Sequence, residues 1–306
     1  MSEEVENTLK KIPILSWFVR QAKKVILPGL EGLSLYDLWE IYSVGIIKGT
    51  FSTRAGSIAF SFFMAIFPFL LFILNLIPYV WFIDDFQLEV LAFMDTLLPP
   101  QTSGFFNDVF ADIVNTPRAG LLSFVFILSI FLMSNGINAI FTGFEFSYHT
   151  TINRSIIRQY FVALGTSIII ALMLLIAVIV FVYLTYIIEN LKSMGIFSDN
   201  LIWAQIGRYL IFILLIYNAV ATLYYFGTKE GRKSRYFSVG AVFTTILIMV
   251  TTFLFSIYIE NFSTYNKLYG SIGALLIMMV YIWLNANILL LGFELNASIN
   301  RLKQNF

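Results

Sequence analysis

The fold is decided by residues 160–187, YFVALGTSIIIALMLLIAVIVFVYLTYI, a stretch without any Asp, Glu, Lys or Arg. A helix rises ~1.5 Å per residue, so this stretch is longer than the roughly 30 Å hydrocarbon core of a bilayer. The run is continuously apolar, which favours a helix over a barrel strand with alternating polar positions. Five more windows free of these charges occur at 57–80, 120–142, 209–226, 238–259 and 270–293. The sequence therefore predicts an all-α, polytopic membrane protein with six transmembrane helices.

The composition supports this class and argues against several kinds of chemistry. Of the 306 residues, 59% are hydrophobic and 12% are charged, and the net charge of +1 gives no bias towards nucleic acid. The chain has no cysteine for a disulfide or a thiolate ligand, and His149 is its one histidine. It also contains neither a Walker lysine motif nor a glycine-rich phosphate loop. We expect no metal, no cofactor and no nucleic-acid partner.

The basic residues indicate the orientation. With six spans, 15 of the 19 Lys and Arg residues fall on one side, together with both termini. The opposite side holds Arg118, Lys192 and Lys267. Because cytoplasmic loops are enriched in Lys and Arg, we expect both termini in the cytoplasm.

Three regions follow from this topology. Residues 1–50 form a cytoplasmic or interfacial segment, 51–297 the transmembrane domain and 298–306 a cytoplasmic tail. Within 12–27, apolar residues alternate with Arg20, Lys23 and Lys24, typical of an amphipathic interfacial helix, although a solvated tether is the alternative. Ser34 is expected to cap a second helix, with Asp37 at its third position.

The external loop 81–118 is acidic and long. Its segments 85–98 and 103–116 mix apolar residues with acids at helical spacing, and Pro99 and Pro100 separate them. We expect two short helices on the outer face, with a re-entrant hairpin as the alternative.

Polar residues inside the predicted spans are the candidates for a substrate path. Pro68 either kinks the first helix to shape a cavity or marks a static bend filled by neighbouring helices. The asparagines either line a polar cavity between the second, fourth and sixth helices or join helices by hydrogen bonds. They are Asn135, Asn138, Asn218, Asn285 and Asn287. Small residues at 57, 61 and 65 and at 163, 167 and 171 predict packing seams.

Charged residues next to the spans form a second candidate group. Arg54 precedes the first span, Glu145 and Arg154 follow the second, and Glu294 closes the sixth. In a compact bundle these ends share one layer, so Arg54–Glu294 or Arg154–Glu145 pairing would lower the cost of burying each charge. We call these four residues the charge layer. It could act as a gate or as a clamp that fastens helix ends.

Two stretches carry a family resemblance. Residues 269–274 read YGSIGA, and they lead through Trp283 to LLLGFELNA at 289–297. Together with Arg54 and Ala55 before a span that contains Pro68, they resemble the YihY/BrkB family of bacterial inner-membrane proteins, formerly labelled ribonuclease BN. The motif residues are Tyr269, Gly270, Gly273, Gly292, Glu294 and Asn296. The resemblance implies six helices with cytoplasmic termini, and it leaves the roles of Glu145 and Gly227 open because the chain departs from the family pattern there.

Members of that family have carried ribonuclease and virulence labels and have been discussed as lipid or ion transporters. Phosphodiester hydrolysis needs clustered metal ligands or a positioned acid and base, and a lone His149 does not predict either. We therefore expect a non-enzymatic transporter or flippase-like protein for an amphiphilic envelope lipid or lipid-linked precursor, with membrane lipids as its partners. The alternatives are an ion or solute exchanger using Glu294 and Glu145, and a scaffold for envelope proteins that docks through its acidic loop. The sequence leaves the oligomeric state open.

Overall fold

The structure is a computed structural model, and it describes ten parts of the chain. They are residues 21–25, 34, 36–37, 50–76, 119–146, 154–193, 202–229, 231, 235–261 and 271–304. Six helices account for most of them: α4 (Thr50–Leu76), α7 (Ala119–Glu145), α8 (Ile156–Ser193), α9 (Ile202–Gly227), α10 (Val239–Asn261) and α12 (Ser271–Gln304).

The predicted all-α class is confirmed. Nearly all of the described residues form helices, and none of them belongs to a β-strand. Five helices, α7, α8, α9, α10 and α12, are long and apolar enough to cross a membrane, while the apolar segment found in α4, Phe51–Ile66, is shorter. The protein is thus a multi-pass membrane protein, and the count of six spans stays a prediction.

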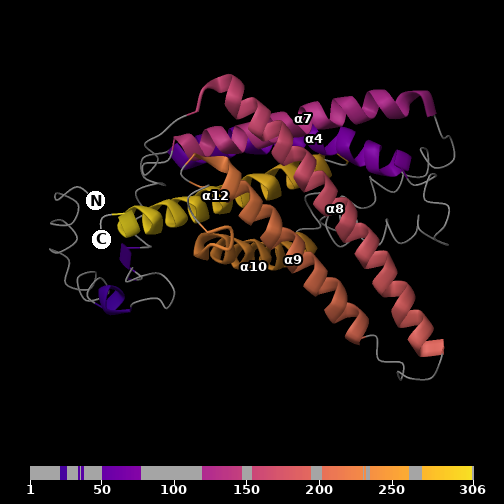
Figure 1. Cartoon of the computed structure of the whole chain (residues 1–306). Helices are drawn as coiled ribbons and strands as arrows, with labels where there is room; N and C mark the ends of the chain where they lie inside the picture. Colours follow the sequence, from indigo (N-terminus) through magenta and orange to yellow (C-terminus); the bar gives the residue numbers. More distant parts are fainter. Residues whose placement is uncertain are drawn as a thin grey trace.

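Each helix packs against the next one along the chain, and α12 closes the bundle against α4. In Figure 1, α4 and α7 lie side by side, and α12 runs between this pair and α10. α8 contacts α7 and α9, and both α8 and α9 run obliquely to the α4–α7 pair. α12 contacts α4, α7 and α10, and α7 contacts α4, α8, α9 and α12.

The core is aromatic at the end of the bundle that carries the charge layer. Phe144 of α7 stacks on Phe293 of α12 with ring centroids 4.1 Å apart, and Tyr224 of α9 meets both rings edge-on. All three side chains are almost fully buried. Because edge-on and stacked aromatic pairs add directional contacts to their buried area, this cluster fixes three helix ends relative to one another.

The predicted packing seams are partly observed. On α8, Ala163 and Ser167 are buried, and the Ser167 hydroxyl lies 3.3 Å from that of Ser134 on α7. On α4, Ala65 is buried but Ser57 is exposed, so that row of small residues does not pack along its whole length.

Pro68 lies inside α4, which continues as a helix to Leu76. It is buried, and its main-chain oxygen accepts a hydrogen bond from Ser129 of α7. The neighbouring helix thus packs directly against the proline.

Several predictions fall partly or wholly outside the described residues. These concern 12–20 and 26–27 of the interfacial helix, the acidic loop 81–118 with its segments 85–98 and 103–116, and Tyr269 and Gly270 of the motif. The cap at Ser34 is described and confirmed. The Ser34 hydroxyl accepts from the Asp37 main-chain N–H at 3.3 Å, and the Asp37 carboxylate accepts from the Ser34 N–H at 2.8 Å.

Candidate functional site

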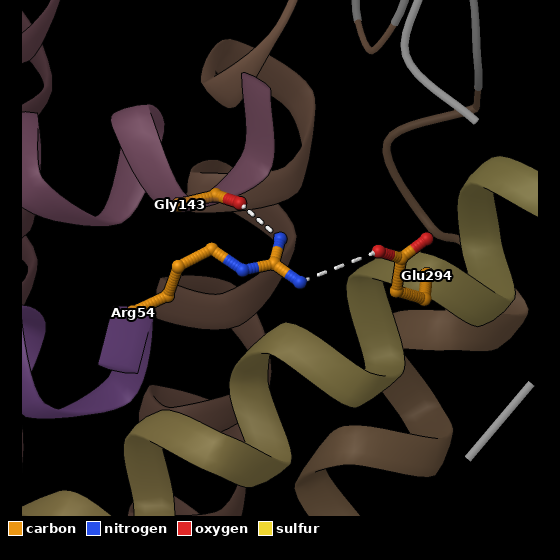
Figure 2. A network of polar contacts seen from close by, with 3 residues as sticks. All are labelled: Arg54, Gly143 and Glu294. Atoms are coloured by element: carbon orange, nitrogen blue, oxygen red, sulfur yellow. Dashed lines mark hydrogen bonds and ion pairs between the residues drawn. The ribbon is translucent and has the colours of Figure 1, made fainter. Parts of the chain in front are cut away.

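Arg54 and Glu294 meet where three helices converge. The guanidinium Nη1 of Arg54, in the first turns of α4, donates to the main-chain oxygen of Gly143 at 2.8 Å. Its Nη2 lies 3.9 Å from Glu294 Oε1 of α12 (Figure 2). The Glu294 side chain is buried, with an exposed fraction of 6%, and the Arg54 side chain is mostly buried, with an exposed fraction of 13%. One arginine therefore links α4 to both α7 and α12.

The bond to Gly143 has a clear electrostatic reason. Gly143 lies in the last turn of α7, which ends at Glu145, and the carbonyls of a last turn carry the negative end of the helix dipole. A cation that donates there forms a charge-assisted hydrogen bond. The pairing with Glu294 is longer than a hydrogen bond, so the Gly143 carbonyl provides the tighter of the two contacts.

Arg154 makes the same kind of contact on another helix. Its Nη1 donates to the main-chain oxygens of Phe226 at 2.6 Å and Gly227 at 3.4 Å, at the C-terminal end of α9. Its contact with Glu145 is made by the main-chain N–H, 3.0 Å from Oε1, rather than by the guanidinium. The structure thus brings Arg154 and Glu145 together in a geometry different from the expected ion pair.

A buried glutamine completes this side of the charge layer. With the Gln159 amide oriented to satisfy its neighbours, its nitrogen donates to the two Glu145 oxygens at 2.8 and 3.1 Å. Its oxygen then accepts from the Thr142 hydroxyl at 2.9 Å. The orientation is assigned from these partners, because Glu145 can only accept when ionised.

The asparagines of the predicted path mostly bond to their own helices. Asn218 donates to Leu214 O, Asn285 to Tyr281 O and Asn287 to Trp283 O, each at 2.8 Å and each one turn back along the same helix. The Asn138 side chain lies 3.1 Å from that of Gln159, and Asn135 is half-buried on α7. Within the described helices, no hydrogen bond joins the asparagines of α7, α9 and α12 to one another, and their role in a path stays a prediction.

Gly292 marks the tightest helix contact at this end of the bundle. A Cβ at this position would overlap the Thr244 hydroxyl of α10 and lie 2.6 Å from the Tyr224 hydroxyl of α9. Those two hydroxyls are 2.6 Å apart, and Tyr224 also donates to Leu289 O at 2.8 Å. Gly240 of α10 packs equally closely against Gly292 O, so three helices meet where α12 has no side chain.

Comparison with known proteins identifies the family to which the chain belongs. The family model described as Virulence factor BrkB matches residues 45–305, which is most of the chain. The chain belongs to this family. Its motif residue Gly292 is thus found at the α9–α10–α12 contact and Glu294 in the Arg54 pair. Asn296 packs against Gly240 beside Gly292, and Gly273 is buried near the start of α12.

Relatives of this BrkB-family chain include a protein named ribonuclease-like and several named UPF0761 membrane proteins. The putative ribonuclease-like protein YfkH of Bacillus subtilis is 29% identical over 82% of this chain and 91% of its own. A UPF0761 membrane protein of Idiomarina loihiensis is 33% identical over 34% of each chain. A UPF0761 membrane protein of Glaesserella parasuis is 25% identical over 60% of this chain and 62% of its own. No solved structure matches the chain.

Sequence reasoning missed three residues of the site, Gln159, Tyr224 and Thr244. Each is a neutral polar residue in or beside an apolar window, and such residues leave no charge signal. Among the described residues, no three His, Cys, Asp or Glu side chains lie together as a metal site would need.

Proposed function

We propose that this BrkB-family protein is a non-enzymatic transporter, flippase-like in action, for an amphiphilic anionic lipid or lipid-linked precursor. We also infer that it resides in the bacterial cytoplasmic membrane with both termini inside, because 15 of its 19 basic residues lie on the side of the termini in the six-span topology.

The buried Arg54–Glu294 pair carries the proposal. Ionisable groups within a membrane protein are costly and often mark the path of a substrate or ion. Here an Nη2–Oε1 contact of 3.9 Å lies in the interface between α4 and α12. Moving Glu294 away from Arg54 would break this long contact and would offer the guanidinium to an incoming anion.

The chemistry of Arg54 suits a phosphate headgroup. A guanidinium presents planar donors that match phosphate oxygens, and the Arg54 side chain already lies over the Phe51 ring with Cζ 4.7 Å from its centroid. The acyl chains of such a substrate would remain in the bilayer beside the exposed apolar faces of α7 and α8. The headgroup alone would then need a polar partner.

We further propose that the chain has no nuclease activity. The name of the Bacillus relative describes that protein as ribonuclease-like. The glutamates of the charge layer have structural partners: Glu294 pairs with Arg54, and Glu145 accepts from the Arg154 main chain. A purified sample that cleaved RNA, with cleavage abolished by Glu294→Gln, would contradict this proposal.

Reconstitution into vesicles tests transport directly. Purified protein in proteoliposomes should speed the chemical quenching of a fluorescent anionic lipid placed in the inner leaflet. Arg54→Gln should remove most of that acceleration, because the substituted side chain loses the guanidinium that would meet the headgroup. Arg235→Gln is the matched control. Arg235 is exposed, and within the described residues it makes no contact with the charge layer.

The outcome has two readings. Acceleration that depends on Arg54 and persists in the Arg235 variant supports the proposal. Correctly folded wild-type protein that leaves lipid movement at the rate of empty vesicles contradicts it.

The buried Glu294 favours one second candidate, an ion or solute exchanger. A carboxylate with an exposed side-chain fraction of only 6% can couple its protonation to a change in its Arg54 partner. Ion flux into the same vesicles without lipid movement, abolished by Glu294→Gln, would favour this candidate. The scaffold function rests on the acidic loop 81–118, which lies outside the described residues, and it stays a prediction.

A further inference from the structure

Four tyrosines are exposed on the surface of α8, α9 and α10. They are Tyr183 and Tyr186 on α8, Tyr209 on α9 and Tyr258 on α10, with exposed fractions between 48% and 63%. Among the residues that the structure describes, these are all of the exposed tyrosines, and we call them the tyrosine belt. The other large exposed side chains on the described parts of these helices are aliphatic or phenylalanine. The belt is therefore where these helices present phenol hydroxyls to their surroundings.

Tyr183 and Tyr209 lie at almost the same level of the bundle. α8 runs away from the charge layer and α9 runs back towards it, because α8 begins just after Arg154 and α9 ends at the carbonyls that Arg154 caps. Leu184 of α8 lies 3.9 Å from the position that a Cβ on Gly207 of α9 would take. Tyr183 is one residue and Tyr209 two residues from this contact, both on the side of the charge layer. The two tyrosines therefore differ in level by about one residue, or ~1.5 Å.

A second contact places Tyr258 at a similar level on α10. The Tyr224 hydroxyl of α9 lies 2.6 Å from the Thr244 hydroxyl of α10, and the two helices run in opposite directions. Tyr209 precedes Tyr224 by 15 residues, and Tyr258 follows Thr244 by 14. At ~1.5 Å per residue, both tyrosines are thus about 22 Å along their helices from the shared contact. Three helices therefore present a tyrosine at a similar distance from the charge layer.

The charged residues of the same helices mark this level independently. When each helix is followed away from the charge layer, its apolar part ends at one charged residue: Glu189 on α8, Arg208 on α9 and Glu260 on α10. Each tyrosine of the belt lies within six residues of that charged residue along its own helix. Because charged side chains are costly inside hydrocarbon, the belt lies where the helices leave the hydrocarbon core.

We propose that the tyrosine belt contacts the headgroup and glycerol region of the lipid leaflet opposite the charge layer. A tyrosine side chain combines an apolar ring with one polar hydroxyl, and such side chains are enriched at the boundary between hydrocarbon and water. Deeper in the bilayer the exposed hydroxyls would lack hydrogen-bond partners, whereas in water the exposed rings would form an apolar surface. The inference does not rest on the proposed transport function.

Site-directed spin labelling tests the position of the belt, because the chain has no cysteine of its own. Tyr183→Cys, Tyr209→Cys and Tyr258→Cys are each labelled with a nitroxide, and the full-length protein is reconstituted in vesicles of phosphatidylcholine and phosphatidylglycerol. Power-saturation EPR compares the collisions of each label with oxygen, which concentrates in hydrocarbon, and with a water-soluble nickel complex. Lipids spin-labelled at known depths calibrate the comparison.

The three belt labels should lie in the interfacial region, which is about 5–8 Å thick outside the hydrocarbon core. Ile176→Cys and Val250→Cys are the matched controls, because both residues are exposed and lie seven and eight residues closer to the charge layer, on α8 and α10. Labels at these two positions should lie inside the core. All five positions are exposed, so the substitutions leave the packed interior unchanged.

Three results would overturn the proposal. A belt label at the depth of the control labels would place the tyrosines in hydrocarbon. Collisions with the nickel complex as frequent as those of free nitroxide in buffer would place them in water. Few collisions with either reagent would mean that protein, rather than lipid, covers the tyrosines.

Discussion

At the scale of single residues, Gly292 is the position where the helices tolerate least change. The Thr244 hydroxyl occupies the space that a Cβ on residue 292 would need, and the Tyr224 hydroxyl is bonded to that same hydroxyl. A side chain at residue 292 would push α10 away from α12, because the short Thr244 side chain cannot move aside. The glycine is therefore required for close approach, although a helix interior normally disfavours it.

Gly292→Ala should destabilise the protein by about 3 kcal/mol or more, because overpacking here would also break the Tyr224–Thr244 bond. The measurement is the yield and melting temperature of detergent-purified protein. Gly165→Ala is the control, since nothing lies within 4 Å of a Cβ at that position of α8. It should be neutral or stabilising by up to about 1 kcal/mol, as expected for alanine in a helix. Equal melting temperatures for the two variants would contradict the packing argument.

Charged residues of the site were predictable, and its neutral residues were not. Arg54 and Glu294 could be placed together because charges next to apolar spans must lie near the same helix ends. Tyr224, Thr244 and Gln159 were not predicted, because their partners depend on how far each helix is rotated about its axis. The apolar pattern of these helices is nearly uniform and does not fix that rotation.

At the scale of elements, two successive helix pairs use the same device. Arg54 near the start of α4 donates to the end of α7, and Arg154 just before α8 donates to the end of α9. Each arginine thus lies at the start of one helix and caps the C-terminal end of another helix at the same end of the bundle. Both contacts use the negative end of a helix dipole.

Arg154→Gln should loosen the end of α9 without unfolding the protein. Loss of the charge at the Phe226 and Gly227 carbonyls should cost about 1.4 kcal/mol, or roughly tenfold faster amide exchange, across the last turn of α9 and residues 228–229. Hydrogen–deuterium exchange with mass spectrometry measures this. Arg158→Gln is the control, because Arg158 is exposed on the next turn of α8. Unchanged exchange in the Arg154 variant would exclude a capping role.

The charge-free windows predicted the helices but not their ends. The window at 160–187 corresponds to α8, which extends from Ile156 to Ser193, and the window at 57–80 corresponds to α4, which begins at Thr50. The windows mark where charges stop, whereas the helices continue past Arg158 and Arg54. Charged residues thus mark where a helix leaves the hydrocarbon core of the bilayer, whereas backbone hydrogen bonding determines where the helix ends.

At the scale of the whole molecule, α8 is too long to stand upright in a bilayer. Its apolar segment Ile156–Ile188 has 33 residues. At ~1.5 Å per residue it is about 50 Å long, and a tilt of roughly 50° would fit it within a 30 Å core. The oblique course of α8 relative to α4 and α7 in Figure 1 agrees with such a tilt.

If α8 is tilted in this way, the protein should be most stable in bilayers of ordinary thickness. Melting temperatures of protein reconstituted in lipids with acyl chains of about 14, 18 and 22 carbons should peak at the middle length, since thinner and thicker cores both create mismatch. The apolar segments of α7, α10 and α12, with 19, 21 and 23 residues, fit the same thickness when nearly upright. A steady rise through the longest chains would instead indicate an upright α8.

The two arginine caps have a consequence for how the protein responds to acid. A guanidinium keeps its proton throughout the range that a living cell experiences, and a peptide carbonyl does not titrate. The hydrogen bonds from Arg54 to Gly143 O and from Arg154 to Phe226 O therefore do not change when the surrounding solution becomes acidic. The ends of α7 and α9 therefore stay held by these caps in acidic and in neutral surroundings alike.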